Sequence, residues 1–334
     1  MQFTTLGRTG LEVSVVGLGG GGASRFGLGS GKSKSDAIRV IRRGLDLGVN
    51  FIDMGGAIYA TEVIVGEALS GCRSEVILST KANLGPPIWN LGSRRAIARF
   101  SARIGAMISY VASGRVIEDR LDASLRELKT DYVDVFHLHA VTPNQYDVAI
   151  ARVYPRLLRL KEAGKLRAIS ISETLARDPS HEVLRRAVSD GPFDCIMIGF
   201  NVANQSGAEI IARAKRREIG SIAMDAVGRW FSSRQGLQDQ LDRLASRGAV
   251  APEDADAGKV LRFLDTHGVA SLTEAAYRFS RHNSGADIVL TGTGDVRHLE
   301  ANIAACTAPP LPDEVTAELT RIFTPAGRSA EHKD

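Results

Sequence analysis

Cysteines are scarce in this chain, and so are the long apolar runs of secreted and membrane proteins. The three cysteines among 334 residues, Cys72, Cys195 and Cys306, are far apart and lack metal-ligand spacing. They predict neither a disulfide framework nor a metal site, and they suit a reducing compartment. The opening segment MQFTTLGRTG has no apolar stretch of signal length, and no window approaches a membrane span. We therefore expect a cytoplasmic protein without a membrane partner.

A strong charge of one sign is also missing. The net charge is +4, and the lysines and arginines are scattered among nearly as many acidic residues. This mild basicity suits a phosphate-bearing ligand better than nucleic acid, so we expect no nucleic-acid partner. The sequence gives no indication of an oligomeric state.

Linkers and repeats are absent as well. No stretch rich in Pro, Gly and Ser divides the chain, and no solenoid-type repeat is present. Hydrophobic residues make up 44% of the chain and charged residues 24%, which is typical of a globular protein with a sizeable core. We expect one domain over residues 1–324 and a flexible polar tail over 325–334.

What the sequence does have is a regular alternation of strands and helices. Apolar runs predict strands at 13–18, 50–54, 75–81, 132–139, 166–172, 194–199, 220–225 and 287–291. Helical periodicity predicts helices at 35–48 (capped by Ser35), 61–70, 116–129, 155–163, 179–189, 206–218, 257–281 and 295–306. This pattern predicts an α/β fold, a single (β/α)₈ TIM barrel with an N-terminal β-hairpin and a short C-terminal helix or tail. The long connections 82–115 and 226–256 are expected over the C-terminal face, where barrel active sites lie.

Four polar residues stand at or just past the tips of three successive predicted strands. They are Asp53, Tyr59, Lys81 and His139. A strand of Val, Ile and Leu has no packing use for a lysine or histidine at its tip, although either residue alone is more often a solvated or satisfied side chain. Because neighbouring strand tips converge on a barrel, an acid, a phenol, an amine and an imidazole would meet. Such a cluster handles protons.

This arrangement resembles the aldo-keto reductase family, and the resemblance covers nearly the whole chain. The matching stretches are GVNFIDM…Y…TEVIVGEAL, EVILSTK, RLDASLRELKTDYVDVFHLH, KEAGKLRAISIS, REIGSIAM and IVLTGTGDVRHLEANI. The resemblance implies an oxidoreductase that transfers a hydride between NADP(H), or alternatively NAD(H), and an aldehyde, ketone, alcohol or sugar.

The same resemblance implies catalytic roles for the four tip residues. Tyr59 would be the general acid and base, and Lys81 beside it would lower its pKa from the usual value of about 10. Asp53 would hold the lysine ammonium in place. His139 would orient the carbonyl and donate a hydrogen bond to the developing oxyanion.

The catalytic loop and the cofactor floor depart from the family pattern. Tyr59 follows Asp53 by six residues rather than the usual five, and Ala60 replaces the glycine that usually follows the tyrosine. After the fifth strand the usual Ser-Asn is replaced by Ser172 and Glu173, and Met197 takes the place of a glutamine. The resemblance still implies that these three residues contact the nicotinamide, although Met197 also suits a core position.

The segments expected at the phosphate end match the family better. The stretch TGTGDVRHLEAN follows the eighth strand and opens a helix, so backbone N–H groups there suit an anion. The resemblance implies nucleotide contacts from Gly292, Thr293, Gly294, Arg297, His298 and Asn302, with Arg297 as the partner of a 2′-phosphate. It also implies pyrophosphate contacts from the turn DAVGR, which contains Asp225, Val227, Gly228 and Arg229.

A glycine-rich stretch after the first predicted strand needs a separate interpretation. GLGGGG (17–22) satisfies the dinucleotide pattern GxGxxG, but no helix follows at once, so we interpret it as a flexible loop whose Gly20 approaches the nicotinamide. Candidates for lining the substrate pocket are Arg25, Phe26, Trp89, Trp230 and Phe231. Aromatic walls would suit an apolar or ring-shaped substrate, but each of these residues is equally suited to anchoring a loop.

Two further functions remain open at this point. The altered residues Glu173 and Met197 are compatible with a nucleotide-binding regulatory module that has little or no turnover. A barrel lyase or isomerase could instead use Lys81 as a Schiff-base amine, although the Tyr and His context argues against it.

Overall fold

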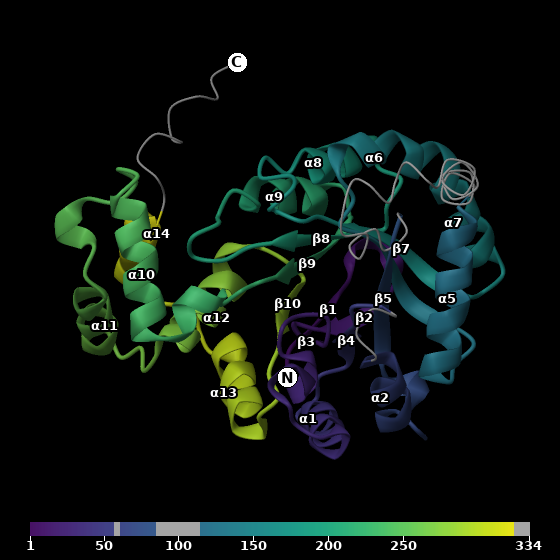
Figure 1. Cartoon of the computed structure of the whole chain (residues 1–334), viewed down its shortest axis with the longest axis horizontal. Helices are drawn as coiled ribbons and strands as arrows, with labels where there is room; N and C mark the ends of the chain where they lie inside the picture. Colours follow the sequence, from purple (N-terminus) through teal and green to yellow (C-terminus); the bar gives the residue numbers. More distant parts are fainter. Residues whose placement is uncertain (57–60, 85–113, 324–334) are drawn as a thin grey trace, which may run out of the picture.

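The fold of the chain is a closed parallel barrel, seen in a computed structural model that describes residues 1–56, 61–84 and 114–323 (Figure 1). Its strands, each paired in parallel with the next and β10 with β3, are β3 (Val16–Gly19), β4 (Phe51–Asp53), β5 (Ile77–Asn83), β6 (Val133–His139), β7 (Leu166–Ser172), β8 (Cys195–Gly199), β9 (Gly220–Met224) and β10 (Ile288–Thr291). All eight coincide with predicted strands. The predicted (β/α)₈ barrel is confirmed.

Helices surround the barrel on its outside (Figure 1). They are α1 (Lys34–Asp46), α2 (Thr61–Ala68), α5 (Arg115–Leu128), α6 (Pro143–Val148), α7 (Tyr154–Glu162), α8 (Glu182–Asp190), α9 (Ala208–Arg216), α10 (Arg234–Ala245), α11 (Ala257–Thr266), α12 (Leu272–Asn283), α13 (Val296–Thr307) and α14 (Asp313–Phe323). Figure 1 shows α10, α11 and α14 gathered at one side of the barrel. No helix in the described ranges is long and apolar enough to cross a membrane.

The N-terminal hairpin closes one end of the barrel. Strands β1 (Phe3–Thr5) and β2 (Glu12–Ser14) pair antiparallel, as predicted. Leu6, Leu11 and Val13 are buried against apolar side chains inside the barrel. Gly220 at the start of β9 permits this contact, because a Cβ there would lie 2.8 Å from the Leu6 side chain. A ligand can therefore reach the barrel interior only from the carboxyl ends of the strands.

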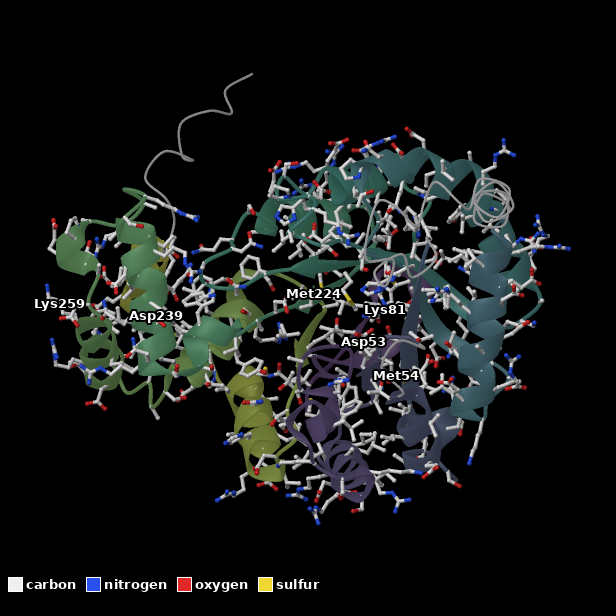
Figure 2. All side chains as sticks on the ribbon, viewed as in Figure 1. Asp53, Met54, Lys81, Met224, Asp239 and Lys259 are labelled. Atoms are coloured by element: carbon white, nitrogen blue, oxygen red, sulfur yellow. The ribbon has the colours of Figure 1, made fainter. Side chains whose placement is uncertain are left out.

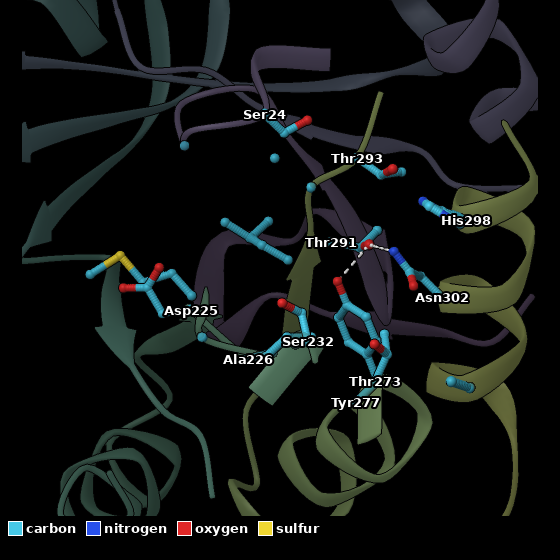
Figure 3. Close-up of a pocket in the computed structure, with 18 of the residues that line it drawn as sticks. Ser24, Asp225, Ala226, Ser232, Thr273, Tyr277, Thr291, Thr293, His298 and Asn302 are labelled. Atoms are coloured by element: carbon cyan, nitrogen blue, oxygen red, sulfur yellow. Dashed lines mark hydrogen bonds between the residues drawn. The ribbon is translucent and has the colours of Figure 1, made fainter. Parts of the chain in front are cut away.

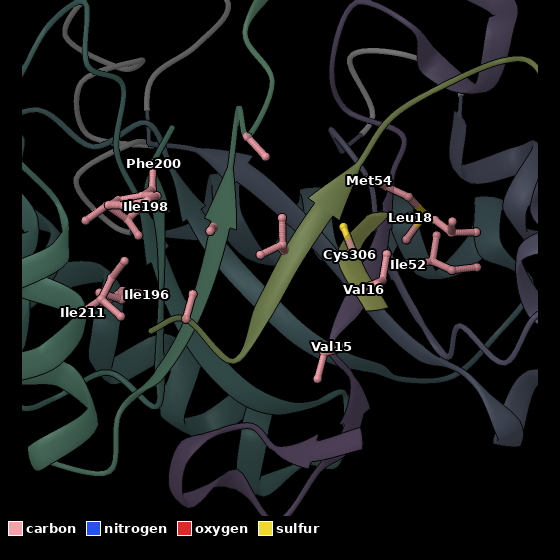
Figure 4. Close-up of a cluster of buried hydrophobic side chains, with 14 of the residues drawn as sticks. Val15, Val16, Leu18, Ile52, Met54, Ile196, Ile198, Phe200, Ile211 and Cys306 are labelled. Carbon is pink, nitrogen blue, oxygen red and sulfur yellow. The ribbon is translucent and has the colours of Figure 1, made fainter. Parts of the chain in front are cut away.

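Strand alternation sorts the side chains between an outer and an inner core. Outward residues such as Val16, Leu18, Ile52 and Ile196 pack against the helices (Figure 4). The lower part of the interior is filled by apolar groups from the other face of the strands, namely Phe51, Val135, Ala168, Cys195, Ile222 and Ile288. Successive strand residues point to opposite faces, which explains this division. The buried charged residues Asp53 and Lys81 lie near the carboxyl ends of their strands.

Two helix boundaries differ from the prediction. Ser33, not Ser35, caps α1: its side chain accepts from the Asp36 N–H, and the Asp36 carboxylate accepts from the Ser33 backbone. A hydroxyl caps best when the acidic residue stands three positions later, which fits Ser33. The predicted helix 257–281 is two helices, because Gly268 takes a positive φ and Ser271 caps α12.

The two predicted long connections compare differently with the structure. Residues 226–256 contain the helix α10, which the prediction of a loop missed, and the rings of Trp230 and Phe231 pack there against Phe323 of α14. Most of 82–115, including Trp89, lies outside the described residues, as does the tail 325–334. The expected C-terminal helix is present as α14.

Helix α2 carries a buried carboxyl group that the fold does not fully satisfy. Glu62 is fully buried, and its Oε1 accepts a hydrogen bond from Thr80 Oγ1 at 2.6 Å. Its Oε2 has no partner among the described residues. Burial raises the pKa of Glu62, the hydroxyls of Thr80 and Ser124 lower it in part, and the nearby Glu127 raises it further.

Replacing this carboxyl with an amide should stabilise the protein most at high pH. The folded-state pKa of Glu62 lies above its ordinary value of 4.5, so its contribution to stability is lost as pH rises through the folded pKa. We expect Glu62→Gln to raise the thermal midpoint more at about pH 8 than at about pH 5. Thermal unfolding across pH measures this, with Glu67→Gln on the same helix as control, because Glu67 is partly exposed and pairs with Lys34. An equal effect of both variants would contradict the prediction.

Candidate active site

Strands β4 and β5 bring a carboxylate and an ammonium together at the open end of the barrel. Asp53 on β4 lies opposite Ser79 on β5, and Lys81 follows Ser79 by two residues on the same strand. The Lys81 Nζ donates to Asp53 Oδ2 at 2.7 Å. Both residues are buried, with 3% of Asp53 and 8% of Lys81 exposed. Figure 2 shows Asp53 and Lys81 within the barrel. Burial raises the pKa of Asp53, and the charge and hydrogen bond of Lys81 lower it in part.

Two further polar residues lie directly beneath this pair. Ser79 Oγ donates to Asp53 Oδ1 at 2.8 Å and lies 2.8 Å from Nε2 of His137. Both residues are fully buried. The sequence reading missed them, although a signal exists: each stands two residues before a predicted site residue on the same strand and so shares its inward face.

His139 reaches the cavity from the end of β6. Burial, followed by the charge of Lys81, lowers its pKa to about 3, so the imidazole is neutral at working pH. Its Nδ1 is buried without a partner in the described structure. The next residue, Ala140, takes a positive φ of 52°, and its N–H donates to Ser172 Oγ at 3.0 Å. Ser172 therefore holds the turn that presents the histidine.

Tyr59 lies outside the described residues, which resume at Thr61. The described part of its loop ends at Gly56, which has a φ of 72°. A Cβ at Gly56 would lie 2.2 Å from the carbonyl oxygen of Lys81, so only glycine permits this approach. The loop that leads to Tyr59 thus leaves β4 against the backbone of the site lysine.

Met197 and Glu173, the two altered floor residues, occupy different environments. Met197 lines the cavity, with its sulfur 3.4 Å from Lys81 Nζ. Glu173 is buried and does not line it. Its Oε1 accepts from the Gly199 N–H at 3.0 Å and its Oε2 lies 2.7 Å from Nδ1 of the buried His181. Both carboxylate oxygens are therefore already bonded within the protein.

A cavity of about 1270 Å³ extends from the buried ion pair across the carboxyl ends of the strands. Its floor includes Asp53, Lys81 and His139. Eight of the expected cofactor-binding residues line it, namely Met197, Asp225, Val227, Gly228, Gly292, Thr293, His298 and Asn302. Five do not, namely Gly20, Ser172, Glu173, Gly294 and Arg297. The side chain of Arg229 is outside the described part of the chain.

The far end of the cavity has an ordered polar wall between α12 and α13 (Figure 3). Thr291 Oγ1 accepts from Asn302 Nδ2 at 2.9 Å and bonds the Tyr277 hydroxyl at 2.9 Å. Tyr277 and Glu274 also line the cavity and were not predicted. Their helix was predicted without its break, so its cavity-facing residues could not be identified.

Unusual backbone conformations shape the cavity walls. Asp225 has a φ of 60°, and Gly228 has φ 62° and ψ 149°, a region open almost only to glycine. Gly20, which was expected to approach the nicotinamide, packs instead against the buried Phe26, and a Cβ there would lie 2.2 Å from the Phe26 ring. Phe26, like Trp230 and Phe231 above, is a hydrophobic anchor in this structure.

The start of α13 is already capped by an acidic side chain. Asp295 Oδ1 accepts from the N–H groups of Arg297 and His298, at 2.9 and 3.3 Å. The Arg297 side chain is 91% exposed and lies 3.8 Å from Asp295. Lys32 Nζ lies 3.5 Å from the same carboxylate. The charged groups around this helix start are therefore paired with one another.

Comparisons with known proteins agree with this geometry. A model of the Aldo/keto reductase family matches residues 17–323. L-galactose dehydrogenase of Arabidopsis thaliana is 27% identical, with 92% of this chain and 88% of that protein covered. The uncharacterized oxidoreductase YqkF of Bacillus subtilis is 25% identical, with 94% of each chain covered. Among solved structures, the holo form of aldo-keto reductase AKR11C1 from Bacillus halodurans has a TM-score of 0.73 at 23% identity, with both chains fully covered, a likeness of fold.

The buried Glu173–His181 contact should be important for stability. Removing one partner of a buried polar contact leaves the other buried without a hydrogen-bond partner. We expect His181→Leu to lower the unfolding free energy by about 3 to 5 kcal/mol, and the double variant Glu173→Gln, His181→Leu to lose less, because no carboxylate is then stranded. Urea unfolding of the wild type, of both variants and of Glu173→Gln gives the coupling free energy between the two residues. Purely additive losses would contradict the expectation.

Proposed function

The chain belongs to the aldo/keto reductase family, and we propose that it transfers a hydride between a nicotinamide dinucleotide and a carbonyl or alcohol substrate. The observation that carries this proposal is the buried Asp53–Lys81 ion pair, at 2.7 Å, on the floor of a long cavity beside a neutral histidine. A buried ammonium next to a cavity has no packing role, but it can lower the pKa of a phenol.

The proposed catalytic roles are as follows. The bound nicotinamide supplies or accepts the hydride. Tyr59 gives a proton to the carbonyl oxygen, or takes one from the alcohol. Lys81 makes this phenol a stronger acid, and Asp53 fixes the ammonium. His139 is neutral because its pKa is about 3, so it donates a hydrogen bond to the developing oxyanion without giving up its proton.

The cavity suits a dinucleotide in size and in lining. Its volume of about 1270 Å³ exceeds that of ordinary small-ligand pockets. Gly19, Gly21, Gly22 and Gly292 line it, so ligand phosphates could approach the backbone closely. Asn302 supplies polar atoms at the far end. These residues would hold the two ends of an extended nucleotide.

Family resemblance implies NADP(H), but the charges near α13 favour NAD(H). A 2′-phosphate at this helix start would meet the Asp295 carboxylate, which already occupies the cap and pairs with Lys32 and Arg297. Glu274, which lines the cavity, adds a carboxylate at this end. Among the described cavity-lining residues, Lys81 is the single lysine or arginine, and it lies at the opposite end. We therefore propose that NAD(H) binds more tightly than NADP(H), with His298 the basic side chain that lines the cavity at this end.

Aldose sugars are the first substrate class to assay. One relative, which matches 92% of the chain at 27% identity, is an L-galactose dehydrogenase. A sugar hemiacetal presents the alcohol that Tyr59 would deprotonate as the hydride leaves. Oxidation of aldoses by NAD⁺ is the direction that this similarity supports.

Two substitutions test the catalytic proposal. We expect Tyr59→Phe and Lys81→Met to lower turnover by about 10²- to 10⁴-fold, because proton transfer is lost, while dinucleotide binding is retained. Steady-state rates with a carbonyl and aldose panel, and fluorescence titration with NADH and NADPH, separate the two effects. Lys165→Met is the control, because Lys165 pairs with Asp122 and does not line the cavity. Unchanged turnover in Tyr59→Phe would refute the proposal.

The cofactor preference is tested by removing the Asp295 charge while keeping a cap. We expect the wild type to bind NADH about tenfold or more tightly than NADPH, because a 2′-phosphate would meet a fixed carboxylate. Asp295→Ser should reduce the ratio of the NADPH dissociation constant to the NADH dissociation constant. Asp256→Ser is the matched control, because Asp256 caps α11 in the same way and, unlike α13, α11 contributes no residue to the cavity lining. A wild-type preference for NADPH would overturn the assignment.

A regulatory module with little turnover remains the second candidate. The observation that favours it is that Met197 and Glu173 offer no amide to the nicotinamide, since Glu173 is bonded to His181 and Gly199. Tight dinucleotide binding without turnover over the whole panel would support it.

A further inference from the structure

We propose that His137 and Ser79 are positioning residues that hold Asp53 in the ionised form and orientation that anchors Lys81. The inference rests on the proposed function of the Asp53–Lys81 pair. Neither residue lines the cavity, so neither can touch a substrate or cofactor. They would act only through the carboxylate above them.

The direction of the hydrogen bonds follows from counting protons. Asp53 Oδ2 accepts from Lys81, and Oδ1 accepts from the Ser79 hydroxyl at 2.8 Å. A serine has a single hydroxyl proton, so Ser79 Oγ is left as an acceptor toward His137 Nε2 at 2.8 Å. The His137 Nε2 must therefore carry the proton in this chain of donors.

The rest of the His137 environment agrees with this tautomer. Its Nδ1 is buried and has no partner in the described residues, as an unprotonated ring nitrogen in an apolar site would be. Burial, then the charge of Lys81 and then His139, hold the pKa of His137 well below its ordinary value. The titratable groups around it are Asp53 on β4, Lys81 on β5 and His139 on its own strand.

The arrangement gives a buried carboxylate the donors that water would otherwise supply. A carboxylate held away from water tends to take up a proton, and burial does raise the pKa of Asp53. A hydroxyl that is itself polarised by an N–H donor favours the ionised form more than an isolated hydroxyl. If Asp53 became neutral, Lys81 would lose the charged partner that anchors it.

The first experiment is a pH profile of turnover. Ser79→Ala and His137→Leu each remove a donor, so Asp53 should protonate at higher pH and the acidic limb of kcat should move upward by about one unit. His137→Gln keeps an N–H donor and should restore much of the wild-type profile. Ser170→Ala is the matched control, because Ser170 is an equally buried serine on β7 that donates to the Cys195 carbonyl.

A second readout does not depend on catalysis. Nitrogen-15 NMR of histidine in the free protein should show His137 as a neutral Nε2–H tautomer that does not titrate between about pH 5 and 8. Carbon-13 NMR of aspartate should show a higher pKa for Asp53 in Ser79→Ala, by about one unit, and no change in Ser170→Ala. A protein without turnover would refute the proposed function and leave these signals intact.

Two results would overturn the proposed positioning role of Ser79 and His137. One is a Nδ1–H tautomer or a cationic His137 at neutral pH. The other is an Asp53 pKa that Ser79→Ala leaves unchanged while the variant remains folded by circular dichroism. Either result would mean that Ser79 and His137 only fill space in the barrel.

Discussion

The Asp53–Lys81 ion pair is the interaction on which the open end of the barrel depends. Two opposite charges are withdrawn from water there, which costs several kcal/mol for each ion unless the partners and further donors compensate. The barrel meets this requirement by placing Ser79 and His137 beside the pair, on the inward faces of β5 and β6. The lower interior is filled with apolar groups and closed by the hairpin. The charged pair therefore lies toward the open end of the barrel and the apolar groups toward the closed end.

Backbone strain is concentrated on the same face. Phe26, Ala140, His181 and Asp225 are non-glycine residues with positive φ, and each lies in a loop that follows a strand end. Such conformations cost of order 1 kcal/mol or more and persist only where the surroundings enforce them. At Ala140 and His181 the enforcing contacts are visible, from Ser172 and from Glu173. The turns that follow β6 and β7 are held in shape by these local hydrogen bonds rather than by regular secondary structure.

The strands and three of the tip residues, Asp53, Lys81 and His139, could be placed from the sequence, because strand periods and strand ends are short-range features. The remaining features depend on contacts between distant segments. Ser79 and His137 share the inward faces of Lys81 and His139, but the sequence alone does not show that Ser79 bonds both Asp53 and His137. The bond between Glu173 and His181 could not be foreseen, since His181 lies in an irregular loop. The break at Gly268 was hidden because the apolar periodicity continues on both sides of it.

The hairpin that seals the barrel has a consequence for how the chain acquires its structure. Its residues are made well before their partners: Arg8 donates to the carbonyl oxygens of Gly191 and Phe193, and Leu6 packs on Gly220. Closing loops of this length carries an entropy cost that is recovered only when both ends are present. The hairpin of a growing chain must therefore wait, unpaired with the barrel, until synthesis has passed Gly220. Sealing of the barrel floor is a late step in folding.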